Sequence, residues 1–448
     1  MSTAQRVGAV REPPSPVQAI HQLFPKGTVK IPIKTVRGLK IRSDNGLEEH
    51  GFPDVMGTSA FLWAEPGDKL TLIDKNYKFD IASYQPMVED KWIYTYDYSP
   101  NQAWVVYDRA PSKNECAEYI FNKKMYFRLC ISRADGADLS DENINNILIF
   151  EKRDVLKFAL LSDSHYVVNG TWDTTIAEIW VANRRIKLDG IIHLGDLTDG
   201  MLGKDICNDY VNLVLGDLRD IGVPVWVALG NHDYNYFREN KDTFTESELC
   251  GLYLNGNSPR YFVNFDTHKL CFIFLDSFDP DRELKYGYSD ECVRWADETL
   301  RALPDDWNVI IFSHLTPLSK LQVWVERIYG ETELMNVLTV HGDKILAFIN
   351  GHQHTDHLFN DEAFPIISIG CAKCEYCLDY KPAGAVTPKR TLGDKTQELW
   401  DILAVDTAVK TLSFERQGSG KDRIVRNGKA EWIVKHDNAH PTDKDMTT

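Results

Sequence analysis

Polar side chains follow five apolar runs in the C-terminal two-thirds of the chain, and this ordered set restricts the fold more than any other feature. The runs lack strict alternation, which is typical of strands that are covered on both faces. Each run is followed within three residues by the Asp, Asn or His of its cluster. The five clusters are Asp163-Ser164-His165, Gly195-Asp196, Gly230-Asn231-His232-Asp233, Ser313-His314 and Gly351-His352-Gln353-His354.

Helix-like stretches separate the apolar runs, and this alternation predicts an α/β domain over residues 151–415. Sheets of this class hold ligand sites outside the carboxyl ends of their strands, so five clusters at strand ends can converge on one site. We expect strands at Lys157–Leu161, Gly190–Leu194, Pro224–Leu229, Leu270–Leu275, Val309–Phe312, Ile345–Ile349, Pro365–Ile369 and Leu399–Val405.

The clusters supply imidazole, carboxylate and amide groups and no thiolate. Imidazole together with carboxylate suits Zn, Mn or Fe, whereas an all-oxygen site would suit Mg or Ca better. Each cluster alone also has a structural interpretation, because a buried His is commonly a core residue and a Gly-Asp pair commonly forms a turn. Asn231 or Asp233 could cap a helix. The complete set in this order is improbable by chance and predicts one metal site.

With all five motifs in this order, the chain resembles the calcineurin-like metallophosphoesterase superfamily over about residues 155–405. The resemblance implies fold class α/β (α+β), with a four-layer β-sandwich flanked by helices. It also implies two divalent metal ions, of Mn, Zn, Fe or Ni, bridged by Asp196. Carried over by motif, one metal is held by Asp163, His165, Asp196 and His354, and the other by Asp196, Asn231, His314 and His352.

The function implied is a dinuclear metal-dependent phosphohydrolase, in which a metal-bridging hydroxide attacks phosphorus. Two divalent ions, two carboxylates and a hydroxide leave a charge of about +1, which attracts a phosphate ester although the chain's net charge is −16. We expect a phosphodiesterase, with a phosphomonoesterase of the same fold as the alternative. No arginine pair of the kind found in protein phosphatases is identifiable in the motif loops. A phage- or assembly-associated binding protein is the other alternative, and it would predict a broken ligand set.

His232 is the motif imidazole that this assignment leaves without a metal, so we expect it to act as general acid or oxyanion stabiliser. Asp233 could orient His232, or it could cap a helix. His193 lies on the strand before the Gly-Asp pair and is either a support for the ligands or a packed core residue. Tyr166 and Asn235 follow metal motifs in loops and either line the substrate site or only pack.

Short β-type runs over residues 40–133 predict a smaller all-β sandwich domain, jelly-roll-like, ahead of the α/β domain. A basic, proline-containing leader (1–39) precedes it, a linker (134–150) follows it, and residues 416–448 are expected to form a C-terminal tail. The leader would suit docking into an assembly such as a phage tail. A set of aromatic residues could stack on carbohydrate or pack inside the domain: Tyr84, Trp92, Tyr94, Tyr96 and Trp104.

Composition excludes several classes of protein. No apolar run approaches the ~18 residues of a membrane span, and the N-terminus has no apolar signal region, so a cytoplasmic location is expected, with a phage virion as the alternative. The acidic net charge disfavours long nucleic acid as a substrate. Phosphate-binding loops, serine-hydrolase elbows and dinucleotide fingerprints are not found. Cys371, Cys374 and Cys377 form a run that is either a third metal site or a reduced or redox-active loop.

Overall fold

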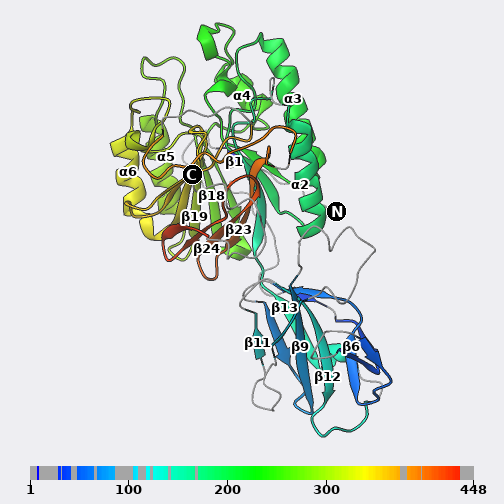
Figure 1. The fold of residues 1–448 in the computed structure, drawn as a ribbon. Coiled ribbons are helices and arrows are strands. Elements are labelled where there is room, and N and C mark those ends of the chain that lie inside the picture. Colours follow the sequence, from blue (N-terminus) through cyan, green and yellow to red (C-terminus); the bar gives the residue numbers. More distant parts are fainter. Residues whose placement is uncertain are drawn as a thin grey trace. The chain divides into compact units, whose positions relative to one another are not determined.

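The computed structural model describes residues 8–9, 29–31, 33–41, 48–64, 68–85, 104–108, 118–121, 125–139, 143–166, 170–373, 381–394 and 396–433. The described chain falls into two compact units (Figure 1). One comprises residues 29–154, and the other comprises residues 155–433 together with the short strand β1 (Gly8–Ala9).

The larger unit contains two seven-stranded sheets. The first has the order β1-β17-β18-β19-β20-β22-β21, with its four middle strands β18, β19, β20 and β22 parallel and the outer strands antiparallel. Its longer strands are β17 (Tyr261–Phe265), β18 (Leu270–Leu275), β19 (Asn308–Ser313), β20 (Ile345–Asn350), β21 (His357–Phe359) and β22 (Ile366–Ser368).

The second sheet has the order β16-β15-β14-β23-β24-β25-β26, in which β14, β15 and β16 are parallel and the remaining strands antiparallel. All eight strands expected from the sequence are present in the two sheets. Two further strands, β25 and β26, lie in the segment expected to form the C-terminal tail. The strands are β14 (Leu156–Leu161), β15 (Gly190–His193), β16 (Val225–Val227), β23 (Leu399–Asp406), β24 (Thr411–Gly418), β25 (Arg423–Arg426) and β26 (Lys429–Trp432).

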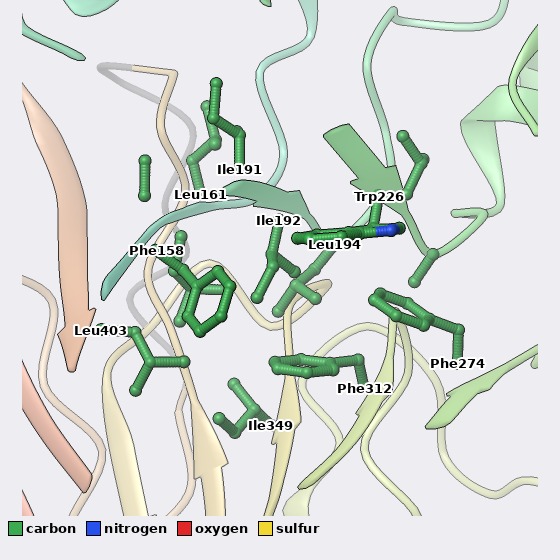
Figure 2. Close-up of a cluster of buried hydrophobic side chains, with 14 of the residues drawn as sticks. Phe158, Leu161, Ile191, Ile192, Leu194, Trp226, Phe274, Phe312, Ile349 and Leu403 are labelled. Carbon is green, nitrogen blue, oxygen red and sulfur yellow. The ribbon is translucent and has the colours of Figure 1, made fainter. Parts of the chain in front are cut away.

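The two sheets pack face to face through one apolar cluster. Figure 2 shows Phe158, Ile192 and Trp226 of the second sheet against Phe312 and Ile349 of the first. Helices α2 (Trp172–Ile186) and α3 (Lys204–Asp220) pack against this cluster, and α5 (Asp290–Ala302) and α6 (Glu331–Val340) pack against the other face of the first sheet (Figure 1). This arrangement confirms the predicted sandwich of two sheets flanked by helices.

The smaller unit is all-β, as the sequence predicts. Its sheets share an apolar cluster in which Phe127 and Leu129 of one sheet meet Leu70 and Phe150 of the other. The jelly-roll-like arrangement stays a prediction. The sheets contain β2 (Val29–Ile31), β3 (Thr35–Arg37), β4 (Leu39–Ile41), β5 (Glu48–His50), β6 (Val55–Thr58), β7 (Leu62–Ala64), β8 (Lys69–Leu72), β9 (Tyr77–Gln85), β10 (Trp104–Asp108), β11 (Glu118–Ile120), β12 (Met125–Arg133) and β13 (Leu148–Lys152).

Some sequence expectations fall outside what the structure describes. Trp92, Tyr94 and Tyr96 are not among the described residues, and the side chains of Tyr84 and Trp104 are not described, so carbohydrate or assembly binding through this unit stays a prediction. In the described part of the chain, no helix is long and apolar enough to cross a membrane.

Candidate metal centre

The carboxyl ends of parallel strands bring the five polar clusters together. In the second sheet, β14, β15 and β16 lie side by side and lead into the first three clusters. In the first sheet, the neighbours β19 and β20 lead into the other two. The predicted ligands therefore follow these strand ends as Asp163 and His165 after β14, Asp196 after β15, Asn231 after β16, His314 after β19, and His352 and His354 after β20.

Three overlapping groups of ligand atoms form at this junction, each with its atoms within 4.8 Å of one another. All members are buried, and both His165 and Asp196 belong to two of the groups. Asn231 joins through its Oδ1, 3.1 Å from His314 Nε2. The groups are Asp163-His165-His354, His165-Asp196-His232 and Asp196-His314-His352.

The atoms around His314 fit a cation. Its Nδ1 lies 2.6 Å from the carbonyl oxygen of Leu194 and donates to it, so Nε2 carries an unshared electron pair when the ring is neutral. That Nε2 lies 3.1 Å from each of three other acceptors, Asp196 Oδ2, Asn231 Oδ1 and His352 Nδ1. Four atoms with unshared pairs pack this closely only around positive charge. The donor set therefore fits a divalent metal ion.

The protonation equilibria point the same way. Burial lowers the pKa of His314, but the carboxylates of Asp196 and Asp163 outweigh burial and raise that pKa to about 9. Burial also raises the pKa of Asp196, and His314 and His232 outweigh it and hold the pKa well below its usual range. Burial and the neighbouring His314 lower the pKa of His352. The centre thus favours ionised carboxylates and attracts positive charge, which a proton supplies in the absence of metal.

Five of the seven predicted ligands have left-handed backbone. Their φ angles are 56° at Asp163, 43° at His165, 54° at Asp196, 62° at His352 and 54° at His354. Residues other than glycine adopt this conformation rarely, at about 1 kcal/mol or more each, and such residues gather at functional sites. The sharp reversal after each strand turns the side chain back over the sheet end.

Two motif glycines allow the loops to approach one another. A Cβ on Gly230 would lie 2.2 Å from Asp196 Oδ1, and a Cβ on Gly351 would lie 1.9 Å from the Ser162 hydroxyl and 2.8 Å from Asp163 Oδ2. No side chain fits at these distances. Both glycines are therefore needed for the loops to approach this closely beside the Asp163 and Asp196 carboxylates.

Asp199 supports two imidazoles, a role that sequence reasoning missed. Its Oδ1 lies 3.1 Å from His165 Nδ1, and its backbone carbonyl lies 2.6 Å from His232 Nδ1. The ammonium group of the buried Lys373 lies 3.4 Å from the same carboxylate. The spacing G-D-L-T-D, with a second Asp three residues after Asp196, was the one available signal.

Asp233 holds the loops and does not contact the His232 ring through its carboxylate. Its oxygens accept hydrogen bonds from the backbone N–H groups of Asp196 and Leu197, each at 2.9 Å, and of Gly230 at 2.8 Å. Burial and the charge of Asp196 raise the pKa of Asp233 to about 7. The contact that orients His232 comes from the carbonyl of Asp199 instead.

His193 combines the two roles that the sequence left open. It is fully buried, and its Nδ1 accepts a hydrogen bond from the Gly195 N–H at 3.1 Å. The remaining ring nitrogen, Nε2, lies 2.6 Å from the Ser164 hydroxyl. Burial lowers the pKa of His193 to about 3, so the ring is neutral. This core histidine links the first two metal-motif loops.

Asn235 and Tyr166 both pack within the unit. The Asn235 amide is buried and donates to the carbonyls of Leu202 and Asp242, each at 2.8 Å, so it ties neighbouring loops together. The half-buried Tyr166 ring packs against Tyr210 with ring centroids 5.5 Å apart.

Only the first cysteine of the run is described. Cys371 is buried, and its thiol donates to the carbonyl of Asp163 at 3.1 Å. Cys374 and Cys377 lie outside the described residues, so the third metal site stays untested.

Comparison with known proteins assigns this unit to a family. Residues 156–356 match the family model described as calcineurin-like phosphoesterase. This part of the chain is a calcineurin-like phosphoesterase domain. The superfamily membership inferred from the five motifs is thereby confirmed.

Two solved structures illustrate the similarity of this phosphoesterase to others. A dimetal phosphatase from Danio rerio is 18% identical, with a TM-score of 0.46 over 60% of this chain and 98% of that one. A purple acid phosphatase from yellow lupin (Lupinus luteus) seeds is 12% identical, with a TM-score of 0.42 over 93% of this chain and 78% of that one. No curated protein gave a significant match.

The matched unit is therefore a metal-dependent phosphoric ester hydrolase domain. The two divalent ions expected for the family are matched by the grouped Asp and His ligand atoms, which lie at the carboxyl ends of both sheets. Its substrate is a phosphate ester.

Proposed function

We propose that this phosphoesterase is a phosphodiesterase whose two metal ions are held by the seven predicted ligands, with Asp196 between them. The observation that carries the proposal is the set of atoms 3.1 Å from His314 Nε2, which fits a bound cation. When bound, two divalent cations make a water molecule acidic and neutralise phosphoryl oxygens. The protein holds the metal ions, orients the ester and protonates the leaving group.

Charge balance favours a diester substrate. With two divalent cations bound, Asp163 and Asp196 leave a surplus of about +2, which ionisation of one water lowers to about +1. A diester monoanion neutralises this surplus, whereas a monoester dianion leaves one negative charge uncompensated. The buried Lys373 does not change the sum, because it is paired with Asp199.

Nearby arginines are engaged elsewhere. The Arg390 guanidinium donates to the carbonyls of Cys371, Ala372 and Lys373 at 2.7–3.0 Å. Arg416 is held in a buried ion pair with Asp356. These two side chains therefore do not supply the extra positive charge that a monoester dianion would need.

His232 is proposed to donate the proton to the leaving group. Its Nδ1 is held by the carbonyl of Asp199, which leaves Nε2 to face the reacting ester. The His232 side chain is 11% exposed, compared with 2% for His314 and 0% for His165, so it is accessible from solvent. The Nε2 atom lies 3.9 Å from Asp196 Oδ2, close to the carboxylate proposed to lie between the metals.

The test compares bis(p-nitrophenyl) phosphate with p-nitrophenyl phosphate on protein loaded with Mn²⁺ or Zn²⁺. The two substrates share a leaving group and differ in charge. We expect kcat/KM to be at least about tenfold higher for the diester, a difference of about 1.4 kcal/mol in the activation barrier. A higher kcat/KM for the monoester would overturn the diester assignment.

The matched controls for that test are two Asp→Asn variants. Asp196→Asn should abolish hydrolysis of both substrates. Asp306→Asn changes an exposed carboxylate that pairs with Lys269 and is not one of the predicted ligands. It should therefore leave both activities unchanged. Full activity in Asp196→Asn would show that hydrolysis does not depend on the proposed metal centre.

A further inference from the structure

Aromatic rings stand against three of the metal-motif imidazoles. The Trp324 ring centroid lies 5.2 Å from that of His354, and Phe237 lies 4.4 Å from His232. Tyr286 lies 5.5 Å from His352. Phe237 and Tyr286 are half-buried, but Trp324 is 38% exposed, so a large part of an indole faces solvent directly beside a predicted metal ligand.

Buried side chains hold the backbone beside Trp324. Gln353, the residue between His352 and His354, is 1% exposed, and its Oε1 accepts a hydrogen bond from the Val323 N–H at 2.7 Å. Its Nε2 donates to Gln322 Oε1 at 2.8 Å. The metal-motif loop therefore fixes the segment that carries the indole, which restrains its position relative to His354.

Burying two amide side chains to support an exposed indole has little value for stability alone. Trp180 offers a comparison, because it is 44% exposed on helix α2 and lies under the Arg184 guanidinium, 4.1 Å from the ring centroid. That environment is an ordinary solvated helix face. Trp324 instead presents its ring next to His354, a predicted ligand of the metal that would bind phosphate.

We propose that Trp324 is a specificity-determining residue that stacks on a planar aromatic substituent of the phosphoester, an aryl group or a nucleobase. The inference rests on the proposed function, because the ester must bind at the metal centre for its substituent to reach the indole. Indoles bind aromatic rings by stacking, which is tolerant of the exact ring and adds about tenfold or more in affinity per stacked base.

The test uses ligands that cannot turn over, measured by titration calorimetry on metal-loaded protein. Phenylphosphonate and methylphosphonate present the same anion and differ only in the ring. The phosphonate analogues of AMP and of ribose 5-phosphate, in which a methylene group replaces the ester oxygen and blocks hydrolysis, form a second pair, which separates a nucleobase from a simple aryl group. We expect the aromatic member of at least one pair to bind about tenfold more tightly, and Trp324→Ala to abolish that advantage while leaving the non-aromatic ligand unchanged.

Two control variants make the result specific. Trp324→Phe keeps an aromatic face and should retain most of the advantage, whereas Trp180→Ala should retain all of it. An aromatic advantage that is missing in both pairs, or that persists in Trp324→Ala, overturns the inference while the proposed function stands. Failure of all four ligands to bind also overturns the inference, whereas the proposed function is judged separately by the hydrolysis of bis(p-nitrophenyl) phosphate.

Discussion

At the scale of single residues, the metal centre is built from side chains placed in unfavourable surroundings. Carboxylates, imidazoles and an amide oxygen are buried together, three of their atoms lie 3.1 Å from His314 Nε2, and several of these residues have left-handed backbone. Both features are unfavourable without a cation and are offset when one binds. This explains why Asp163 and His165 can follow β14 in a conformation that L-residues rarely adopt.

The sequence predicted that these motif residues would meet, because each motif places its polar residue at a strand end; that they bind metal stays a prediction. It did not predict Asp199, Lys373 or Trp324, whose roles depend on neighbours that are distant in sequence. Lys373 meets Asp199 across 174 positions of the chain. Asp233 was considered as a support for His232, but its position is decided by three backbone N–H groups that no motif reveals.

His232 gives the sharpest prediction at this scale. We expect His232→Ala to keep two metals and a normal fold while kcat falls about 10²–10⁴-fold, the span usual for lost proton transfer. The defect should be smallest for nitrophenolate leaving groups, which need little protonation, and largest for alkoxides. Kinetics on a leaving-group series would measure this.

Two other results for His232→Ala, one from metal analysis and one from the leaving-group series, would contradict its role as proton donor. Loss of a metal equivalent in His232→Ala would make it a ligand, in line with its place in the group with His165 and Asp196. An equal loss across all leaving groups would assign it to substrate positioning.

At the scale of elements, parallel strands in two neighbouring sheets explain why clusters from distant parts of the sequence meet. The continuous apolar runs made β14, β15, β18, β19 and β20 predictable, because strands covered on both faces lack polar residues. β24 was not predicted, because its buried side alternates Leu412, Phe414 and Arg416 with half-exposed residues. A buried arginine hides that pattern from sequence reasoning.

The close approach of Gly230 to the Asp196 loop predicts that one added methyl group has a large effect on metal binding and stability. Gly230→Ala would drive its Cβ into the Asp196 carboxylate, and we expect both loss of metal and destabilisation of about 1–3 kcal/mol. Thermal unfolding and metal analysis would measure the two effects.

The matched control is Gly216→Ala on helix α3, where an added Cβ meets nothing within 4 Å. Because glycine is a poor helix former, this variant should be stabilised by up to about 1 kcal/mol. Similar behaviour of the two variants would contradict the crowding at Gly230.

At the scale of the whole unit, a buried ionic network joins strands β24 and β25 to the loop that carries His352 and His354. Arg416 binds Asp356 at 2.7 Å and Asp401 at 2.9 Å, and Arg423 binds Asp356 at 2.8 Å and also pairs with Asp401. All four side chains are at most 1% exposed, and Asp356 lies two residues after His354. The final strands of the second sheet therefore support the loop that carries His352 and His354.

Removal of one arginine tests this support. Arg416→Met leaves two buried carboxylates with one partner, and we expect the free energy of unfolding to fall by about 3–5 kcal/mol. Arg426→Met on the same hairpin, which breaks an exposed pair with Glu431, should change it by less than about 1 kcal/mol. Urea unfolding would measure both, and equal effects would contradict a structural role for the network.

The same network predicts a pH dependence. Burial raises the pKa of Asp356, but Arg416 and Arg423 outweigh burial and lower it below the usual value. A lowered pKa contributes stability above about pH 4, the value for an unfolded chain, and that stability is lost as the pH falls through the folded pKa. Arg416→Met should therefore show a weaker loss of stability on acidification than the wild type.

The central claim is a dinuclear centre bridged by Asp196, and metal stoichiometry tests it most directly. After loading with Mn²⁺ or Zn²⁺ and removal of excess metal, the wild-type protein should hold two equivalents. Asp196→Asn should lose both together, while Asp306→Asn should keep two. A wild-type protein that binds fewer than two equivalents, or an Asp196→Asn variant that loses only one, would contradict the bridged centre.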